Sequence, residues 1–221
     1  MKHKIRVSCL AALAAASVVI AGCGNSEPPV EEGRFKSLPK DCADLTAPVA
    51  PAVKEFAGAL YVPTEKFSAI DTSGLPELTD TSTVMCSIHF SDISPFKKAG
   101  AAQYRYVDIS IDLGRSKNPV ESAIGSFRAE KKNWMGSSPT TAGIGDESFA
   151  STEGSGNDAR AKTHFRISNI NVDLIASGEN STGQSASPQT SSDAAQLVSE
   201  LQSGSSAIAR SLFENIGSVV Q

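Results

Sequence analysis

Three stretches in which apolar and polar residues alternate constrain the fold of this chain more than any other feature. Residues 82–91, 104–113 and 161–176 carry an apolar side chain at most of their alternate positions, with exceptions such as Arg105 and Thr163. Because successive side chains of a strand point to opposite faces, each stretch predicts a strand with one buried face. The third stretch is interrupted by Ser168–Asn169, which predicts a hairpin with a two-residue loop.

Helical spacing of apolar residues appears in three other regions. A short turn over residues 42–47 and a main helix over about 50–60 are expected first. Asn118–Pro119 predicts the start of a second helix. Asp193 can cap a long C-terminal helix, in which Gly204 is expected to cause a break or a bend.

The order of these elements predicts an α+β fold. Strands that follow one another without intervening helices favour antiparallel pairing, so we expect an antiparallel sheet of about five strands packed against two or three helices, with one disulfide. A single domain is expected over residues 41–221, with a mobile Ser/Gly-rich loop near 177–192. Gly143–Glu147 is expected to be a glycine turn that leads into an edge strand.

The N-terminus has the pattern of an export signal. Lys2, Lys4 and Arg6 precede an uncharged apolar run over residues 7–21, which is too short to span a bilayer as a helix. Residues 1–22 are therefore expected to be a signal peptide. The run ends in Ile20-Ala21-Gly22-Cys23, which looks like the lipobox of bacterial lipoproteins.

The lipobox pattern predicts that Cys23 is the lipidation site, with a diacylglyceryl group and fatty-acid chains such as palmitate. Two acyl chains are enough for stable anchoring, so the expected location is the extracytoplasmic face of the cell membrane. Residues 23–40 are polar and rich in proline, and they are expected to form a lipidated tether. The alternative is ordinary secretion, with Cys23 a free thiol.

Cysteine usage then leaves one pair. Cys9 leaves with the signal peptide and Cys23 takes the lipid, so Cys42 and Cys86 remain in an oxidising compartment. We predict a structural disulfide between them. A reducible switch built from the same two cysteines is the alternative.

The charge balance argues against a nucleic-acid partner. The whole chain has 20 Lys and Arg against 24 Asp and Glu, and removal of the signal peptide lowers the basic count to 17. A phosphate backbone attracts clustered Lys and Arg, and no such cluster occurs in the sequence. No nucleic-acid partner is expected, and the bilayer contact is assigned to the lipid on Cys23.

Residue patterns for catalysis are sparse, so no catalytic residue, metal site or cofactor is predicted. The mature chain holds two histidines, His89 and His164, both on the outward side of predicted strands, and two are too few for a zinc site. Motifs for a serine nucleophile or a phosphate-binding loop are incomplete. Four aromatic residues could line a ligand pocket: Tyr104, Tyr106, Trp134 and Phe149.

The layout from Asp41 onward resembles small actinobacterial lipoproteins grouped as a domain of unknown function. The resemblance rests on the lipobox, the Cys42 and Cys86 pair, Gly-Ile-Gly-Asp-Glu-Ser at 143–148 and the hairpin over 166–174. Extracytoplasmic sensor domains have similar layouts. The resemblance implies a non-enzymatic module that binds or senses an unknown small ligand. A structural or assembly factor that acts through an envelope protein is the alternative.

Overall fold

The computed structural model describes residues 30–71, 80–92, 94, 98, 100–134, 139–155, 158–180 and 191–221. The signal peptide and Cys23 lie outside the described residues. No helix within these ranges is long and apolar enough to cross a membrane.

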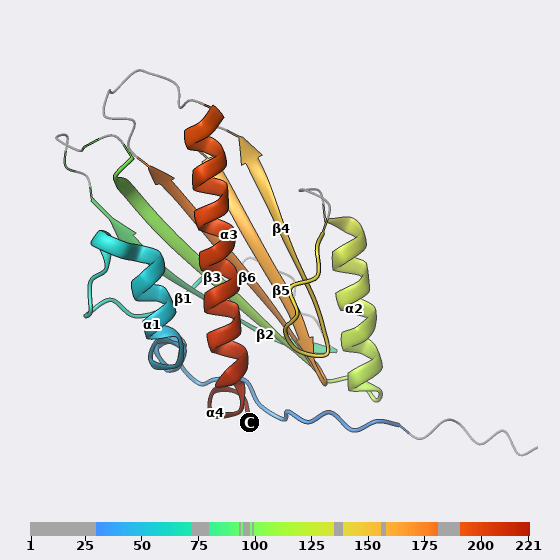
Figure 1. Cartoon of the computed structure of the whole chain (residues 1–221). Coiled ribbons are helices and arrows are strands. Elements are labelled where there is room, and N and C mark those ends of the chain that lie inside the picture. The colour runs from blue at the N-terminus through green and yellow to red at the C-terminus, as the bar shows by residue number, and fades with distance from the viewer. Residues whose placement is uncertain are drawn as a thin grey trace, which may run out of the picture.

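The described residues form one six-stranded antiparallel sheet with helices packed on it (Figure 1), and the predicted α+β class is confirmed. The strands, in the spatial order β1-β2-β3-β6-β5-β4, are β1 (Ser68–Ala69), β2 (Thr81–Ser91), β3 (Ala102–Gly114), β6 (Ile170–Asn180), β5 (Asp158–Ile167) and β4 (Glu147–Ser155). The helices are η1 (Cys42–Leu45), α1 (Thr46–Ala57), η2 (Gly58–Leu60), α2 (Pro119–Asn133), α3 (Ser191–Glu214) and α4 (Ile216–Val219). The strand beyond the expected five is β1, whose two residues are too few for an alternation pattern.

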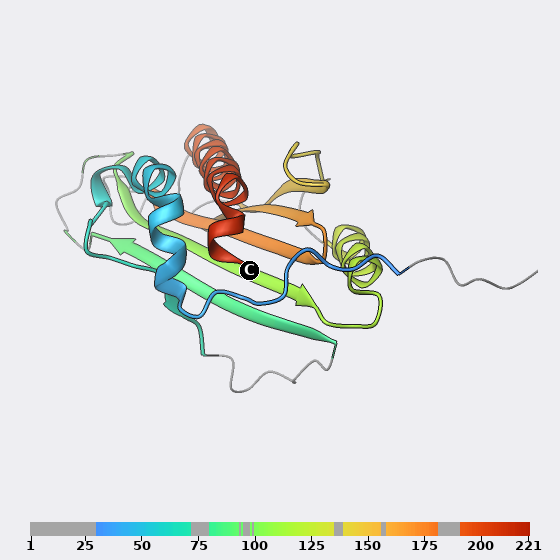
Figure 2. The same cartoon turned by 90° about the horizontal axis from the view of Figure 1, so that it is seen from below.

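The apolar positions of the alternating stretches all lie on one face of the sheet, under α1 and α3. Figure 2 shows these two helices together on one side of the strands. On this face Phe165 contacts Phe213 of α3, and Ser205 of α3 donates a hydrogen bond of 2.8 Å to Thr163. The core residues of the central strands are Val107, Ile109, Ile111, Leu113, Ile170, Val172, Leu174 and Ala176, all almost fully buried.

The predicted hairpin is confirmed. Ile167 pairs with Ile170, so Ser168 and Asn169 form a two-residue loop between β5 and β6. Ser168 has a φ of 51°, which a tight type II′ hairpin turn requires of its first central residue. Its backbone N–H donates to the Asp146 carboxylate (2.7 Å), and Arg166 donates to the same oxygen (2.9 Å). The Gly143–Glu147 segment is therefore a turn that leads into the edge strand β4 and braces the hairpin.

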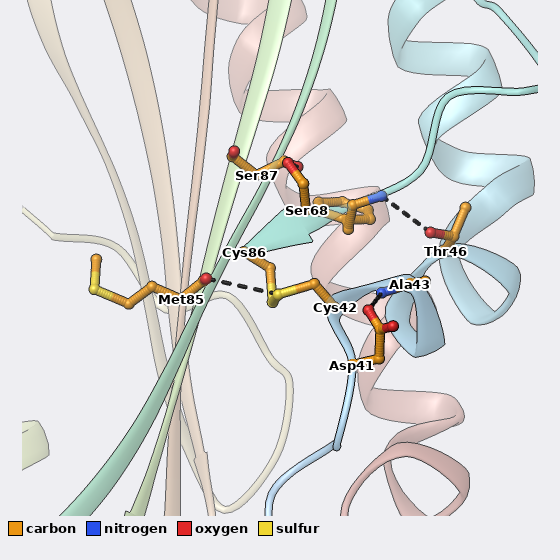
Figure 3. Close-up of a disulfide and its surroundings, with 9 residues drawn as sticks. Asp41, Cys42, Ala43, Thr46, Ser68, Met85, Cys86 and Ser87 are labelled. Carbon is orange, nitrogen blue, oxygen red and sulfur yellow. Dashed lines mark hydrogen bonds between the residues drawn. A yellow bond between two sulfur atoms is a disulfide. The ribbon is translucent and has the colours of Figure 1, made fainter. Parts of the chain in front are cut away.

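The predicted disulfide between Cys42 and Cys86 is confirmed, with 5.6 Å between the Cα atoms (Figure 3). It joins the start of η1 to β2, and both cysteines are buried. Asp41 caps η1 by accepting a hydrogen bond of 2.8 Å from the Ala43 N–H. Closing a loop with a sequence separation of 44 stabilises the fold by about 4 kcal/mol in the chain-entropy model.

The tether that was expected over residues 23–40 does not extend to residue 40. Residues 33–40, here called the strap, lie against the domain, where Phe35 is only 3% exposed. The Phe35 N–H donates to the Asn169 side chain (3.0 Å), and the Asn169 amide donates back to the Phe35 carbonyl (2.9 Å). The N–H groups of Lys36 and Ser37 donate to the Gln221 carbonyl. Polar composition suggested a free segment, but one aromatic residue and backbone hydrogen bonds are enough to dock it.

Two elements have boundaries that differ from expectation. The strand β6 continues to Asn180, so residues 177–180 belong to the sheet and not to the expected mobile loop. The next residues of that loop, 181–190, lie outside the described residues. The first α-helix begins at Thr46 and ends at Ala57, because Gly58 has a φ of 57° that an α-helix cannot accommodate. Residues 58–60 continue as the short turn η2.

A break or a bend was expected at Gly204, and the break does not occur, because α3 continues through this residue to Glu214. Gly204 faces the Phe56 ring of α1, and a Cβ atom at position 204 would lie 2.2 Å from Phe56 Cδ2. The glycine is thus required for the close approach of α1 and α3. Glycine has a low helix propensity, and the contacts between the two helices keep residue 204 helical all the same.

We predict that Gly204→Ala destabilises the protein by about 1–3 kcal/mol, because the added methyl overlaps the Phe56 ring and the two helices must separate. The matched control is Gly125→Ala in the middle of α2, where no atom beyond the adjacent residues and the helix's own backbone lies within 4 Å of the added methyl. This control should stabilise by up to about 1 kcal/mol through helix propensity. Urea unfolding of both variants measures the difference. Equal effects of the two substitutions would contradict the role assigned to Gly204.

Candidate functional site

The sheet face opposite α1 and α3, here called the polar face, carries charged and aromatic side chains. The helix α2 covers one part of it. Phe127 of α2 contacts Phe149 and His164, and the Asn171 amide donates a hydrogen bond of 3.0 Å to the Ala123 carbonyl. Farther along the strands, towards the start of β3, the side chains on this face are half-buried or exposed. This second part of the polar face is open to a ligand.

A depression of about 370 Å³ lies on the open part of the polar face. Its size is within the range of about 300–1,000 Å³ that is usual for ligand pockets. Four strands contribute to it. Its lining residues are His89 of β2, Tyr104, Tyr106 and Asp108 of β3, Arg160 of β5, and Ile175 and Ser177 of β6.

The strand register places the lining side chains in rows across the sheet. His89 pairs with Tyr106, Tyr106 pairs with Ser177, and Ser177 pairs with Arg160. Because Tyr104 and Tyr106 are two positions apart on one strand, both rings lie on the same face. The His89 ring lies 5.7 Å from the Tyr106 ring and 6.3 Å from the Tyr104 ring. Three rings therefore form an aromatic wall, and the smaller side chains of β6 form the floor beside it.

Two opposite charges flank the depression. Burial raises the pKa of Asp108, while the hydrogen bond from the Tyr106 phenol and the positive charge of Arg160 lower it without cancelling the effect of burial. Arg160 also pairs with Glu153 at 3.7 Å. The depression thus offers a negatively charged acceptor, the Asp108 carboxylate, and a positively charged donor, the Arg160 guanidinium, beside its aromatic wall.

A buried ionic cluster lies next to the depression, beneath α2. Lys162, whose side chain is 3% exposed, contacts the carboxylates of Asp173 (2.5 Å) and Glu130 (2.7 Å). Its ammonium also lies 4.5 Å from the centre of the Trp134 ring, a cation–π contact. Burial lowers the pKa of Lys162, but the two carboxylates outweigh it and the net shift is upward. Lys162 therefore stays charged and links α2 to the sheet.

His164 is part of the same buried layer. It lies on the side predicted for it, away from α1 and α3, but α2 covers it and it is 5% exposed. Its ring stacks on Phe149 with 5.3 Å between centroids. Burial, assisted by the charge of Lys162, lowers the pKa of His164 to about 4. The imidazole is consequently neutral near pH 7.

A second depression of about 370 Å³ lies between α1 and α3, with Arg105 and Phe56 in its lining. The Arg105 guanidinium donates to the carbonyls of Tyr104 and Glu179 and to the side chains of Asn180 and Glu200. All of these partners belong to the protein itself. Arg105 thus joins the sheet to α3, and this depression is a weaker candidate for ligand binding.

Of the four aromatic residues expected to line a pocket, two do so. Tyr104 and Tyr106 line the depression, whereas Phe149 is fully buried under α2 and Trp134 covers Lys162. The sequence indicated the outward position of His89 but not its part in the wall. The remaining lining residues were missed, because the register of β5 and β6 against β3 is needed to bring them together.

Within the described ranges, no group of three or more His, Cys, Asp or Glu side chains is arranged to hold a metal ion. The Cys42 and Cys86 disulfide lies on the face packed against the helices and takes no part in the depression. Cys23 lies outside the described residues.

Comparison with protein-family models, with curated proteins and with solved structures finds no match for this chain. The resemblance to small actinobacterial lipoproteins therefore stays a prediction.

We predict opposite pH dependences for two variants of the buried layer. Burial raises the pKa of Asp173 to about 6, whereas that of His164 is lowered to about 4. Between pH 6 and about 4 the folded state binds a proton at Asp173 that the unfolded state does not, so Asp173 increases the free energy of unfolding as the pH falls. Between pH 6.5 and about 4 the unfolded state binds a proton at His164 that the folded state does not, so His164 decreases the free energy of unfolding as the pH falls. In the wild type the two effects oppose each other, at roughly 3 kcal/mol each.

Relative to wild type, His164→Gln should gain unfolding free energy as the pH falls from 7 to 4, because the contribution of Asp173 is left unopposed. Asp173→Asn should lose unfolding free energy over the same range. Urea unfolding at several pH values measures both differences. Parallel pH profiles for the two variants and the wild type would contradict the assignment.

Proposed function

We propose that this chain is a lipoprotein anchored through Cys23 to the extracytoplasmic face of the cell membrane, and that its folded domain binds a ligand without catalysing a reaction. The lipobox pattern and the disulfide support the location, because disulfides persist in oxidising compartments. The polar segment that precedes the strap gives the anchor some reach. The domain is then a binding module exposed outside the membrane.

The single observation that carries ligand binding is the depression on the open part of the polar face. Its aromatic wall and its few polar groups are the usual composition of a small-molecule site. The helix α2 covers the neighbouring part of the same face but leaves this part uncovered. The half-buried rings of Tyr104 and Tyr106 offer a ligand aromatic surface to pack against.

The spacing of the lining residues favours binding over chemistry. A serine nucleophile needs a base within hydrogen-bonding distance. Ser177 lies on β6 and His89 on β2, with β3 between them, so their backbones are about 10 Å apart. Arg160 already pairs with Glu153, and Asp108 accepts a hydrogen bond from Tyr106. These groups can orient a ligand, but they form no nucleophile and base pair.

The anchor predicts a defined mature N-terminus. Mass spectrometry of the protein isolated from membranes of a bacterial host should show a chain that begins at Cys23 and carries a diacylglyceryl group. Cys23→Ser should release the domain from the membrane fraction, because the acyl chains supply the bilayer affinity. An unmodified Cys23, or cleavage at another position, would contradict the anchor.

The depression predicts where ligands bind. In a fragment screen followed by two-dimensional NMR of the wild-type domain, binding fragments should shift the signals of His89, Tyr104 and Tyr106. Ile175→Trp, which fills the floor of the depression, should abolish these shifts. Ile124→Trp, at a half-buried position of α2, is the matched control and should keep them.

Fragments that bind only elsewhere, or not at all, would contradict a ligand site in the depression. A stoichiometric envelope protein recovered by crosslinking, together with that negative result, would support an assembly factor instead.

A further inference from the structure

The chemistry of the depression narrows the class of ligand. Among the residues that the structure describes, the lining of the depression holds one carboxylate, Asp108, and one guanidinium, Arg160, which also pairs with Glu153. One carboxylate is too few to hold a divalent cation. A single, already paired arginine is a weak site for a phosphate. The charges of the depression therefore complement a ligand with no net charge.

The aromatic wall indicates the shape of that ligand. Tyr104, Tyr106 and His89 present neighbouring rings at an open surface. The negative face of an aromatic ring attracts C–H groups with partial positive charge. One face of a sugar ring consists of such C–H groups, and its edge consists of hydroxyls that donate and accept hydrogen bonds. Asp108, Arg160 and Ser177 can meet donors and acceptors at that edge.

We propose that the depression binds a neutral saccharide unit of an envelope glycan strand. This inference rests on the proposed function, since it assigns a ligand class to the same site. The sugar stacks on the aromatic wall of Tyr104 and Tyr106, and its hydroxyls bond to Asp108 and Arg160. Ile175 on the floor excludes water from the stacked face.

The position of the strap favours a cell-wall glycan, rather than a membrane lipid, as the ligand of the depression. The strap is attached at the turn between β5 and β6, through Asn169 (Figure 1). Arg160 lies seven residues up β5 from Ile167, so the depression is roughly 20–25 Å from that end of the sheet. Cys23 and Gly33 are ten positions apart, so the strap begins at most about 35 Å from the lipid. The depression thus lies at the end of the sheet farther from the point where the strap is attached.

The test uses the mature chain, residues 23–221, with Cys23→Ser, which carries no lipid that could itself insert into vesicles, and three probes. These are protein-free cell-wall sacculi, a soluble tetramer of β-1,4-linked N-acetylglucosamine, and anionic phospholipid vesicles. We expect the chain to sediment with sacculi, the tetramer to compete, and the tetramer to shift the NMR signals of Tyr104 and Tyr106. Tyr106→Ala should weaken binding to sacculi by about tenfold or more, as should Arg160→Gln.

Arg128→Gln is the matched control, because Arg128 also lies at the surface and pairs with Glu147 at 3.6 Å, much as Arg160 pairs with Glu153. It should bind sacculi like the wild type. Because Tyr106→Ala removes a half-buried ring, its fold is checked by circular dichroism, and Arg160→Gln gives a second readout at an exposed residue.

Failure to sediment with sacculi, sedimentation unaffected by both variants, or sedimentation with vesicles alone would overturn the glycan proposal. If the tetramer has no effect while other fragments still bind in the depression, the saccharide assignment fails and the proposed binding function stands. If Ile175→Trp leaves all fragment binding intact, both fail.

Discussion

The pairing of β3 with β6 is the constraint on which the rest of the structure depends. These strands lie at the centre of the sheet and pair from Ala102 to Leu113, with one irregularity near the start of β3. A shift by a single residue would turn every core side chain to the opposite face. The correct register therefore commits one face to the apolar core under α1 and α3, and it gives the other face the charged and aromatic residues. The depression is a direct consequence, because its rows of side chains exist only in this register.

The position of α2, which covers only part of the polar face, depends on a balance between the cost of burying charges and the contacts that offset it. Burying Lys162 under α2 costs desolvation, which the contacts with Asp173 and Glu130 offset. A buried ion pair of this kind adds little net stability, but it is sensitive to geometry, because a displaced partner would leave a charge buried alone. The cluster therefore sets the position of α2 against the sheet. Its apolar neighbours Phe127 and Phe149 supply the favourable burial.

The local features of the fold could be predicted from the sequence. The alternating stretches, the Ser168–Asn169 turn and the Cys42 and Cys86 bridge depend on residues whose preferences act over short distances or on a cysteine count. Docking of the strap and the continuity of α3 through Gly204 could not be predicted. Phe35 meets Asn169 across a sequence separation of 134 residues, and Gly204 meets Phe56 of another helix. A pattern within one segment contains no information about such partners.

The covering of His164 is a case in which the missing information was present but spread over two elements. Alternation shows that a strand has a polar side, and it does not show whether that side meets water or another helix. The second helix, however, has its own apolar stripe with Val120, Ala123 and Phe127, which must be buried somewhere. The sheet face opposite the polar face is already covered by α1 and α3. The helix α2 can therefore bury its apolar stripe only on the polar face. Its 15 residues span about 22 Å, less than the roughly 43 Å of β3, so α2 cannot cover the whole polar face. The open part is the end that holds Tyr104 and Tyr106.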